Sequence, residues 1–153
     1  MNIFTQNVAE IKISYSTNVR PSDRIQISSS SASYKIFEAI FLESCDIEYR
    51  EFFYVMLLNR ANKCLGVSQI SAGGQSGTVA DPKLIFQAAL KASASSIILC
   101  HNHPSGNLKP SEADIKLTNK IIAGGKLLDL PVLDHLIITS EAYYSFADEG
   151  LIS

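Results

Sequence analysis

Hydrophobic and polar positions in the first half of the chain follow two different periods. Residues 8–15 alternate apolar with polar side chains, which predicts a half-exposed β-strand. The serine-rich residues 28–33 predict a linker or the entry to a helix, and residues 34–42 carry apolar side chains at helical spacing. Two apolar runs at 52–58 and 64–70, separated by a short polar segment, predict a β-hairpin.

Strands and helices are expected to alternate in the second half. Residues 82–94 predict a helix, with Asp81 as its N-cap and a proline at the first helical position. Residues 96–100 form a short apolar run that is typical of a buried strand. A further helix is expected to begin near Ser111, because apolar side chains recur at helical spacing behind it. Residues 132–139 predict another strand.

This order of elements defines the expected architecture. Strands that alternate with helices after an early hairpin predict an α/β fold, with a mixed β-sheet flanked by helices. A length of 153 residues suits one domain with a hydrophobic core. We expect residues 1–30 to contribute an N-terminal strand and linker to the same unit, and residues 31–153 to form the main domain. The glycine- and serine-rich residues 71–77 predict a loop that can move.

Composition and charge limit the function. Apolar residues make up 46% and charged residues 18% of the chain, as in ordinary globular proteins. A net charge of −2 and a pI near 5.9 give no overall electrostatic footprint for nucleic acid, so we expect any nucleic-acid binding to be weak. Without a signal-peptide pattern or an apolar run of about 18 residues, we expect a cytoplasmic protein that does not span a membrane. A homo-oligomer stays open as an alternative to a monomer.

The cysteines indicate a reducing compartment. Cys45, Cys64 and Cys100 are odd in number and widely spaced, which fits reduced thiols better than a disulfide framework. Cys100 is adjacent to His101. Neighbouring side chains on a strand point to opposite faces, so we expect Cys100 to lie in the core and not to bind a metal with His101.

Side chains that bind divalent transition metals gather between residues 101 and 114. His101 and His103 follow the apolar run, and residues two apart on an extended chain point the same way. Residues 104–106 predict a turn, after which the first turn of the next helix can present Asp114 to the same edge. Two imidazoles and one carboxylate suit zinc, and three protein ligands leave a fourth position for water. The sequence therefore predicts a reactive zinc site.

The same residues carry a resemblance to a known family. The pattern H-x-H, seven residues, S-x-x-D resembles the JAMM (MPN) metalloprotease motif at every specified position. The longer segments HNHPSGNLKPSEAD, LDHLIIT and YYSFADEG are similar to the bacterial RadC branch of that family, from about residue 51 to the C-terminus. The resemblance implies the JAMM/MPN, cytidine deaminase-like layout of a mixed sheet and helices. RadC proteins often carry an upstream helix-hairpin-helix segment, which nothing in residues 1–50 resembles, so we expect a short form.

The resemblance also implies an activity and roles for its residues. The family motif includes an upstream glutamate, and Glu51 stands where RadC-like sequences carry theirs, at the start of a predicted buried strand. His101, His103 and Asp114 would then hold Zn²⁺. Glu51 would act as general base toward water, and Ser111 would help stabilise the oxyanion. The expected reaction is hydrolysis of an amide bond, peptide or isopeptide, in a peptide or protein substrate.

Simpler interpretations of these residues stay open. Ser111 and Asp114 also fit a helix capping box, a role compatible with metal binding because the cap would aim the carboxylate. Glu43 and Glu48 lie near Glu51, and any of the three could be solvated surface.

The third histidine, His135, is expected to be a strand residue satisfied by hydrogen bonds, with Asp134 as a candidate partner. Support of a metal ligand is its alternative role.

Two rival functions remain. A DNA-processing or DNA-binding accessory would need a local basic groove, for which Lys109, Lys116, Lys120 and Lys126 are candidates. Such lysines are most often a solvated helix face. A metal-binding interaction module without catalysis would follow if Glu51 lay away from the site.

Overall fold

The described part of the computed structural model, residues 7–44, 47–74 and 80–153, contains a five-stranded sheet. Its strand order is β2-β1-β3-β4-β5, and the β3–β4 pair is parallel while the other pairs are antiparallel. The strands are β1 (Phe52–Leu58), β2 (Cys64–Ala72), β3 (Ser96–Asn102), β4 (Val132–Ile138) and β5 (Tyr143–Ser145). The helical elements are η1 (Pro21–Asp23), α2 (Ser30–Ser44), α3 (Pro82–Lys91) and α4 (Glu112–Leu127). The predicted α/β fold with a mixed sheet is confirmed.

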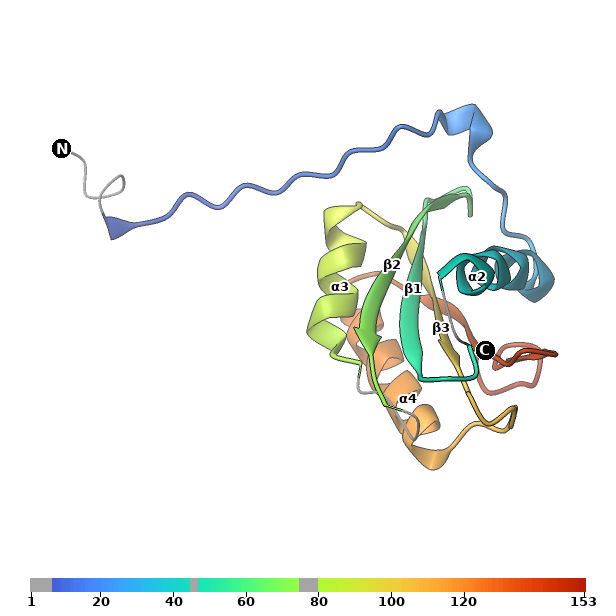
Figure 1. Cartoon of the computed structure of the whole chain (residues 1–153). Coiled ribbons are helices and arrows are strands. Elements are labelled where there is room, and N and C mark those ends of the chain that lie inside the picture. Colours follow the sequence, from blue (N-terminus) through green and yellow to red (C-terminus); the bar gives the residue numbers. More distant parts are fainter. Residues whose placement is uncertain (1–6, 45–46, 75–79) are drawn as a thin grey trace.

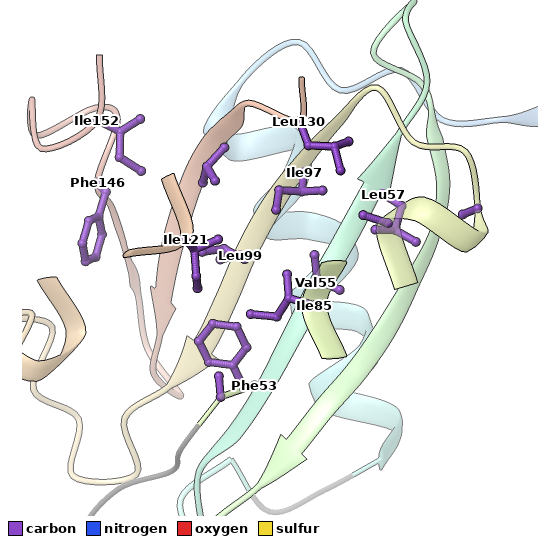
Figure 2. Packing of buried hydrophobic residues seen from close by; sticks show 14 of the residues in the cluster. Phe53, Val55, Leu57, Ile85, Ile97, Leu99, Ile121, Leu130, Phe146 and Ile152 are labelled. Carbon is purple, nitrogen blue, oxygen red and sulfur yellow. The ribbon is translucent and has the colours of Figure 1, made fainter. Parts of the chain in front are cut away.

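Helices cover both faces of this sheet. Helix α2 lies on one face, and α3 and α4 lie on the other (Figure 1). Strand β1 is buried on both sides: Phe53, Val55 and Leu57 join the core under α3 and α4. Tyr54 and Met56 join the core under α2. Figure 2 shows the first of these cores, in which side chains of the strands meet those of α3 and α4.

Strand β3 alternates in the same way, and this places the expected site. Leu99 packs in the core under α3 and α4, whereas Ile98 and Cys100 pack under α2. His101 therefore faces the side of α3 and α4, and the fully buried Cys100 faces the opposite side, as predicted. Cys64 and Cys100 are both free thiols; Cys45 lies outside the described residues.

The helix caps expected from the sequence are present. Asp81 is the N-cap of α3, and its Oδ1 accepts a 2.9 Å hydrogen bond from the backbone N–H of Lys83. The helix ends at Lys91, earlier than the predicted 82–94, and Ser93 adopts a left-handed φ of 54° just beyond it. A residue in that conformation cannot continue an α-helix.

The largest difference from the sequence prediction concerns residues 8–15. They form an exposed, extended arm instead of the predicted strand, with Ile11 86% and Ile13 78% exposed. Figure 1 shows this arm leading away from the sheet. An alternating pattern describes a strand that has a partner, and in the described residues no strand pairs with the arm.

Two strand boundaries differ, and one strand is additional. Strand β3 runs through Asn102, and β2 runs through Ala72 into the predicted loop 71–77, of which residues 75–77 lie outside the described residues. The three-residue β5 was not predicted, because so short a strand has little periodicity of its own. Within the described ranges, no helix has both the length and the apolar character needed to cross a membrane.

Candidate metal centre

The expected metal-binding side chains meet at the carboxyl end of β3. His101 is the sixth residue of that strand, and its side chain is buried. The backbone N–H of His103 bonds to the carbonyl of Ile138, so the chain still follows β4 one residue past the strand. The chain then turns through Gly106, whose φ of 86° favours glycine, and returns at the N-terminus of α4.

Three donor groups converge there. Nε2 of His101 lies 3.0 Å from Nε2 of His103 and 3.3 Å from Oδ1 of Asp114. Nε2 of His103 lies 3.2 Å from Oδ2 of Asp114. Ligands of a tetrahedral zinc ion at bond lengths of about 2.0–2.1 Å stand roughly 3.3 Å from one another. The three side chains therefore have the spacing that such an ion requires.

The hydrogen bonds of His103 show which of its nitrogens can bind a metal. Nδ1 lies 2.6 Å from the carbonyl oxygen of Asn107, which can only accept. The proton is therefore on Nδ1, and in the neutral ring Nε2 turns a lone pair toward His101 and Asp114. In the absence of a bound cation, this nitrogen can accept a proton, because the negative charge of Asp114 favours the protonated ring.

Electrostatics in the cluster agree with this picture. Burial by itself would raise the pKa of Asp114, but the neighbouring imidazoles of His101 and His103, and a hydrogen bond from the backbone N–H of Ser111, hold it well below its usual range. Burial would lower the pKa of His103, but its bonds to Asp114 and to Asn107 raise it above the ordinary value, with help from the charge of Glu51. The carboxylate stays ionised, and the cluster attracts a cation.

Glu51 belongs to the same cluster. An oxygen of Glu51 and a nitrogen from each of His101 and His103 all lie within 4.8 Å of one another, an arrangement that could hold a metal ion. The pairing of β1 with β3 explains why Glu51 lies near the histidines. Phe53 pairs with His101 in the antiparallel register, so Glu51, two residues before Phe53, faces His103, two residues after His101. Glu48 is exposed to solvent.

The middle residue of the His-Asn-His segment forms hydrogen bonds that position the segment carrying Glu51. Asn102 is fully buried; its amide nitrogen donates to the carbonyls of Ile47 (2.7 Å) and Arg50 (2.9 Å). Its Oδ1 accepts a 2.7 Å bond from the N–H of Phe52. One side chain of β3 thus forms hydrogen bonds with the backbone of both neighbours of Glu51. This role of Asn102 was not predicted from the sequence, although an asparagine enclosed by strand residues is a polar group that requires partners.

Ser111 and Asp114 form the predicted capping box. Oγ of Ser111 accepts a 3.0 Å bond from the N–H of Asp114, and Oδ2 of Asp114 accepts a 2.9 Å bond from the N–H of Ser111. The box fixes the turn that aims Asp114 at the histidines. Because Oγ is the acceptor in this contact, the hydroxyl proton of the exposed Ser111 remains to be donated elsewhere.

His135 lies directly behind the cluster. It is fully buried, stacks on Phe146 at 4.7 Å between ring centroids, and its Nε2 lies 2.8 Å from Nδ1 of His101. Its Nδ1 lies 2.6 Å from Oγ1 of Thr118, which the sequence analysis did not single out. Asp134, the expected partner, bonds instead to the backbone N–H of His135 and to other groups. Burial lowers the pKa of His135 well below its ordinary value, so the ring is neutral at physiological pH.

The lysines considered for nucleic acid are exposed at the surface. Lys109 lies in the loop before α4, and all four of these side chains are exposed. The others lie on α4; they are Lys116, Lys120 and Lys126.

The fold and this cluster define an α/β domain with a mixed sheet and residues that could hold a metal ion. Residues 27–151 match the RadC-like JAB domain family, and the chain belongs to that family. It is 46% identical to a UPF0758 protein of Flavobacterium johnsoniae over 82% of this chain and 53% of that relative. A UPF0758 protein of Porphyromonas gingivalis is 48% identical over 67% of this chain and 46% of its own length. The chain thus spans about half the length of these relatives.

Proposed function

We propose that this domain is a zinc-dependent hydrolase of amide bonds, acting on a peptide or protein substrate. The observation that carries the proposal is the convergence of His101, His103 and Asp114 at 3.0–3.3 Å, with a carboxylate oxygen of Glu51 beside the two imidazoles. Membership of the RadC-like JAB family supports the class of reaction.

His101, His103 and Asp114 would hold the ion. All three offer the nitrogen and oxygen donors that zinc accepts, and the capping box keeps the carboxylate in place. A bound zinc ion would supply Lewis-acid chemistry, polarising a carbonyl and making water more acidic.

Glu51 would move the proton. Its carboxylate is close enough to both imidazoles to reach a water molecule held beside them. It would accept the proton of the attacking water and then deliver it to the leaving amine. The hydrogen bonds of Asn102 to the carbonyl of Arg50 and the N–H of Phe52 would hold Glu51 for both transfers.

Ser111 would face the developing negative charge. Its Oγ is occupied as an acceptor by the N–H of Asp114, which leaves the hydroxyl proton to donate to an oxyanion. Replacement by glycine tests this role, since glycine at an N-cap costs only a few tenths of a kcal/mol, whereas loss of one such donor typically costs about 10²–10³ in kcat.

The test is cleavage of a mixed peptide library by the zinc-loaded protein, followed by mass spectrometry of the products. The same protein is assayed against an isopeptide-linked ubiquitin-like substrate. We expect zinc-dependent cleavage that Ser111→Gly slows and that the surface control Lys116→Ala does not affect. Absence of cleavage of both substrates by protein with full zinc occupancy would contradict the proposal.

A further inference from the structure

We propose that Thr118 and His135 are positioning residues that set the tautomer of His101, so that its Nε2 presents a lone pair to the metal site. This inference rests on the proposed metal site, but its evidence is the direction of three consecutive hydrogen bonds. The chain of bonds starts at the backbone carbonyl of Asp114 and ends at the ring of His101.

The first bond fixes the proton of Thr118. Oγ1 of Thr118 lies 2.7 Å from the carbonyl oxygen of Asp114, one helical turn earlier in α4. A carbonyl oxygen has no proton to give, so at this distance the hydroxyl proton must lie between the two oxygens. This is the usual bond of a helical threonine to the carbonyl four residues before it. The hydroxyl of Thr118 has then used its single proton.

The second bond fixes the proton of His135. Nδ1 of His135 lies 2.6 Å from Oγ1 of Thr118, and it must be the donor because the hydroxyl has no further proton. A neutral imidazole carries one N–H, so Nε2 of His135 is an acceptor. The ring is well placed for this role, since it is fully buried, stacks on Phe146 and meets Phe53 edge-on at 5.6 Å.

The third bond fixes the proton of His101. Its Nδ1 lies 2.8 Å from Nε2 of His135 and must donate to it. The remaining nitrogen, Nε2, then has a lone pair directed toward His103 and Asp114, at 3.0 and 3.3 Å. The opposite order of donors would leave a proton on Nε2, where it would exclude a metal ion.

The series of hydrogen bonds begins and ends at residues of the metal site. Asp114 supplies a carboxylate to the site and, through its backbone carbonyl, the acceptor that orders the protons behind His101. Histidine ligands of metals usually donate their second N–H to a carboxylate, a carbonyl or water. Here a neutral imidazole takes that place, and its own direction depends on a helix carbonyl.

The experiment measures the tautomer of His101 directly. Protein with ¹⁵N-labelled histidine is studied without metal by long-range ¹H–¹⁵N NMR at mildly alkaline pH, where histidines are neutral. The chain has three histidines, so single substitutions assign the rings. We expect His101 and His135 both to be protonated on Nδ1. A proton on Nε2 of His101 would overturn the inference.

Variants of Thr118 provide a second test. Thr118→Val keeps the branched shape but removes the hydroxyl, whereas Thr118→Ser keeps it. We expect Thr118→Val to disturb the Nδ1–H tautomer and to weaken zinc binding about 10–100-fold, while Thr118→Ser keeps both. His135→Gln, which retains an acceptor for His101, should bind zinc more tightly than His135→Leu.

Circular dichroism and thermal denaturation show whether each variant is folded. A folded Thr118→Val protein with unchanged tautomer and zinc affinity would contradict the inference. The NMR reading requires neither metal nor substrate, so failure of the protein to hydrolyse amides would count against the proposed function alone.

Discussion

The backbone N–H of Phe52 donates a 2.7 Å hydrogen bond to Oδ1 of Asn102, joining the segment next to Glu51 to the strand between His101 and His103. Two more bonds from the same amide, to the carbonyls of Ile47 and Arg50, complete the connection. The spacing between Glu51 and the histidines therefore depends on a residue that itself binds neither metal nor substrate in the proposed mechanism.

Replacement of Asn102 by alanine should separate positioning from metal binding. The change leaves partly buried backbone groups without their partner, and such a group costs up to roughly 1–3 kcal/mol when it is fully shielded from water. We expect a lower free energy of unfolding, measured by urea denaturation, and slower hydrolysis, with zinc content retained. Asn119→Ala, on the exposed surface of α4, is the control and should change none of these. Hydrolysis at the original rate in folded Asn102→Ala would contradict the positioning role.

Metal content should follow the histidines. In the part of the chain that the structure describes, the metal-binding donors converge at one cluster, so we expect about one zinc per chain by elemental analysis. His101→Ala combined with His103→Ala should lose the metal, because the change removes both imidazole ligands. An unchanged zinc content in the double variant would show that the ion binds elsewhere.

Glu51→Gln should distinguish a base from a ligand. An amide cannot accept a proton at neutral pH, so we expect zinc to stay bound while kcat falls by about 10²–10⁴-fold. Glu48→Gln, on an exposed residue three positions earlier, should have no effect on either measurement. Loss of zinc in Glu51→Gln would instead make Glu51 a ligand.

Zinc affinity should fall as the pH is lowered. Burial opposes protonation of His103, but its bonds to Asp114 and to Asn107 raise its pKa above 6.5. A protonated Nε2 cannot bind metal, so affinity is lost as the pH falls through the raised pKa. Titration of zinc at a series of pH values checks this, and a constant affinity across that pKa would contradict it.

Above pH 6.5, the stability of the metal-free protein should change with pH in the direction opposite to zinc affinity. A pKa raised by folding stabilises the protein fully below the unfolded value of 6.5, and that contribution is lost as the pH rises through the folded value. We expect the Tm without metal to decrease with pH in this window, and the Tm with zinc to increase. Below 6.5, both forms lose stability, because the unfolded state takes up a proton on His135 whereas the buried ring, whose pKa is lowered by folding, stays neutral.

DNA binding should be weak and sensitive to salt. The net charge is −2, and the lysines near the site lie on the exposed surface of α4 and the loop before it. We expect dissociation constants no tighter than about 10⁻⁴–10⁻⁶ M for duplex and single-stranded oligonucleotides at physiological salt. Nanomolar binding that Lys116→Glu with Lys120→Glu abolishes would favour the DNA-processing alternative.

Local patterns determined most of the secondary structure. The apolar runs of β1 to β4 and the caps at Asp81 and Ser111 act over a few residues, so the sequence could predict them. Residues 8–15 show the limit of this reasoning. Their alternation is a strand pattern, but a strand also needs a neighbour to receive its hydrogen bonds, and local sequence carries no information about that neighbour.

The candidate site divides in the same way. His101, His103 and Asp114 lie within fourteen residues, joined by one turn and one helix cap, so their convergence could be predicted from spacing. Glu51 could be identified only through the family resemblance, because its position beside the histidines depends on the β1–β3 register.

The tertiary structure alone decided the environment behind these residues. Asn102 meets the chain around Glu51 from some fifty positions away, and His135 reaches His101 only because β4 pairs in parallel with β3. Such contacts arise from sheet pairing between distant segments, where the partner and the register follow from the packing of the whole core.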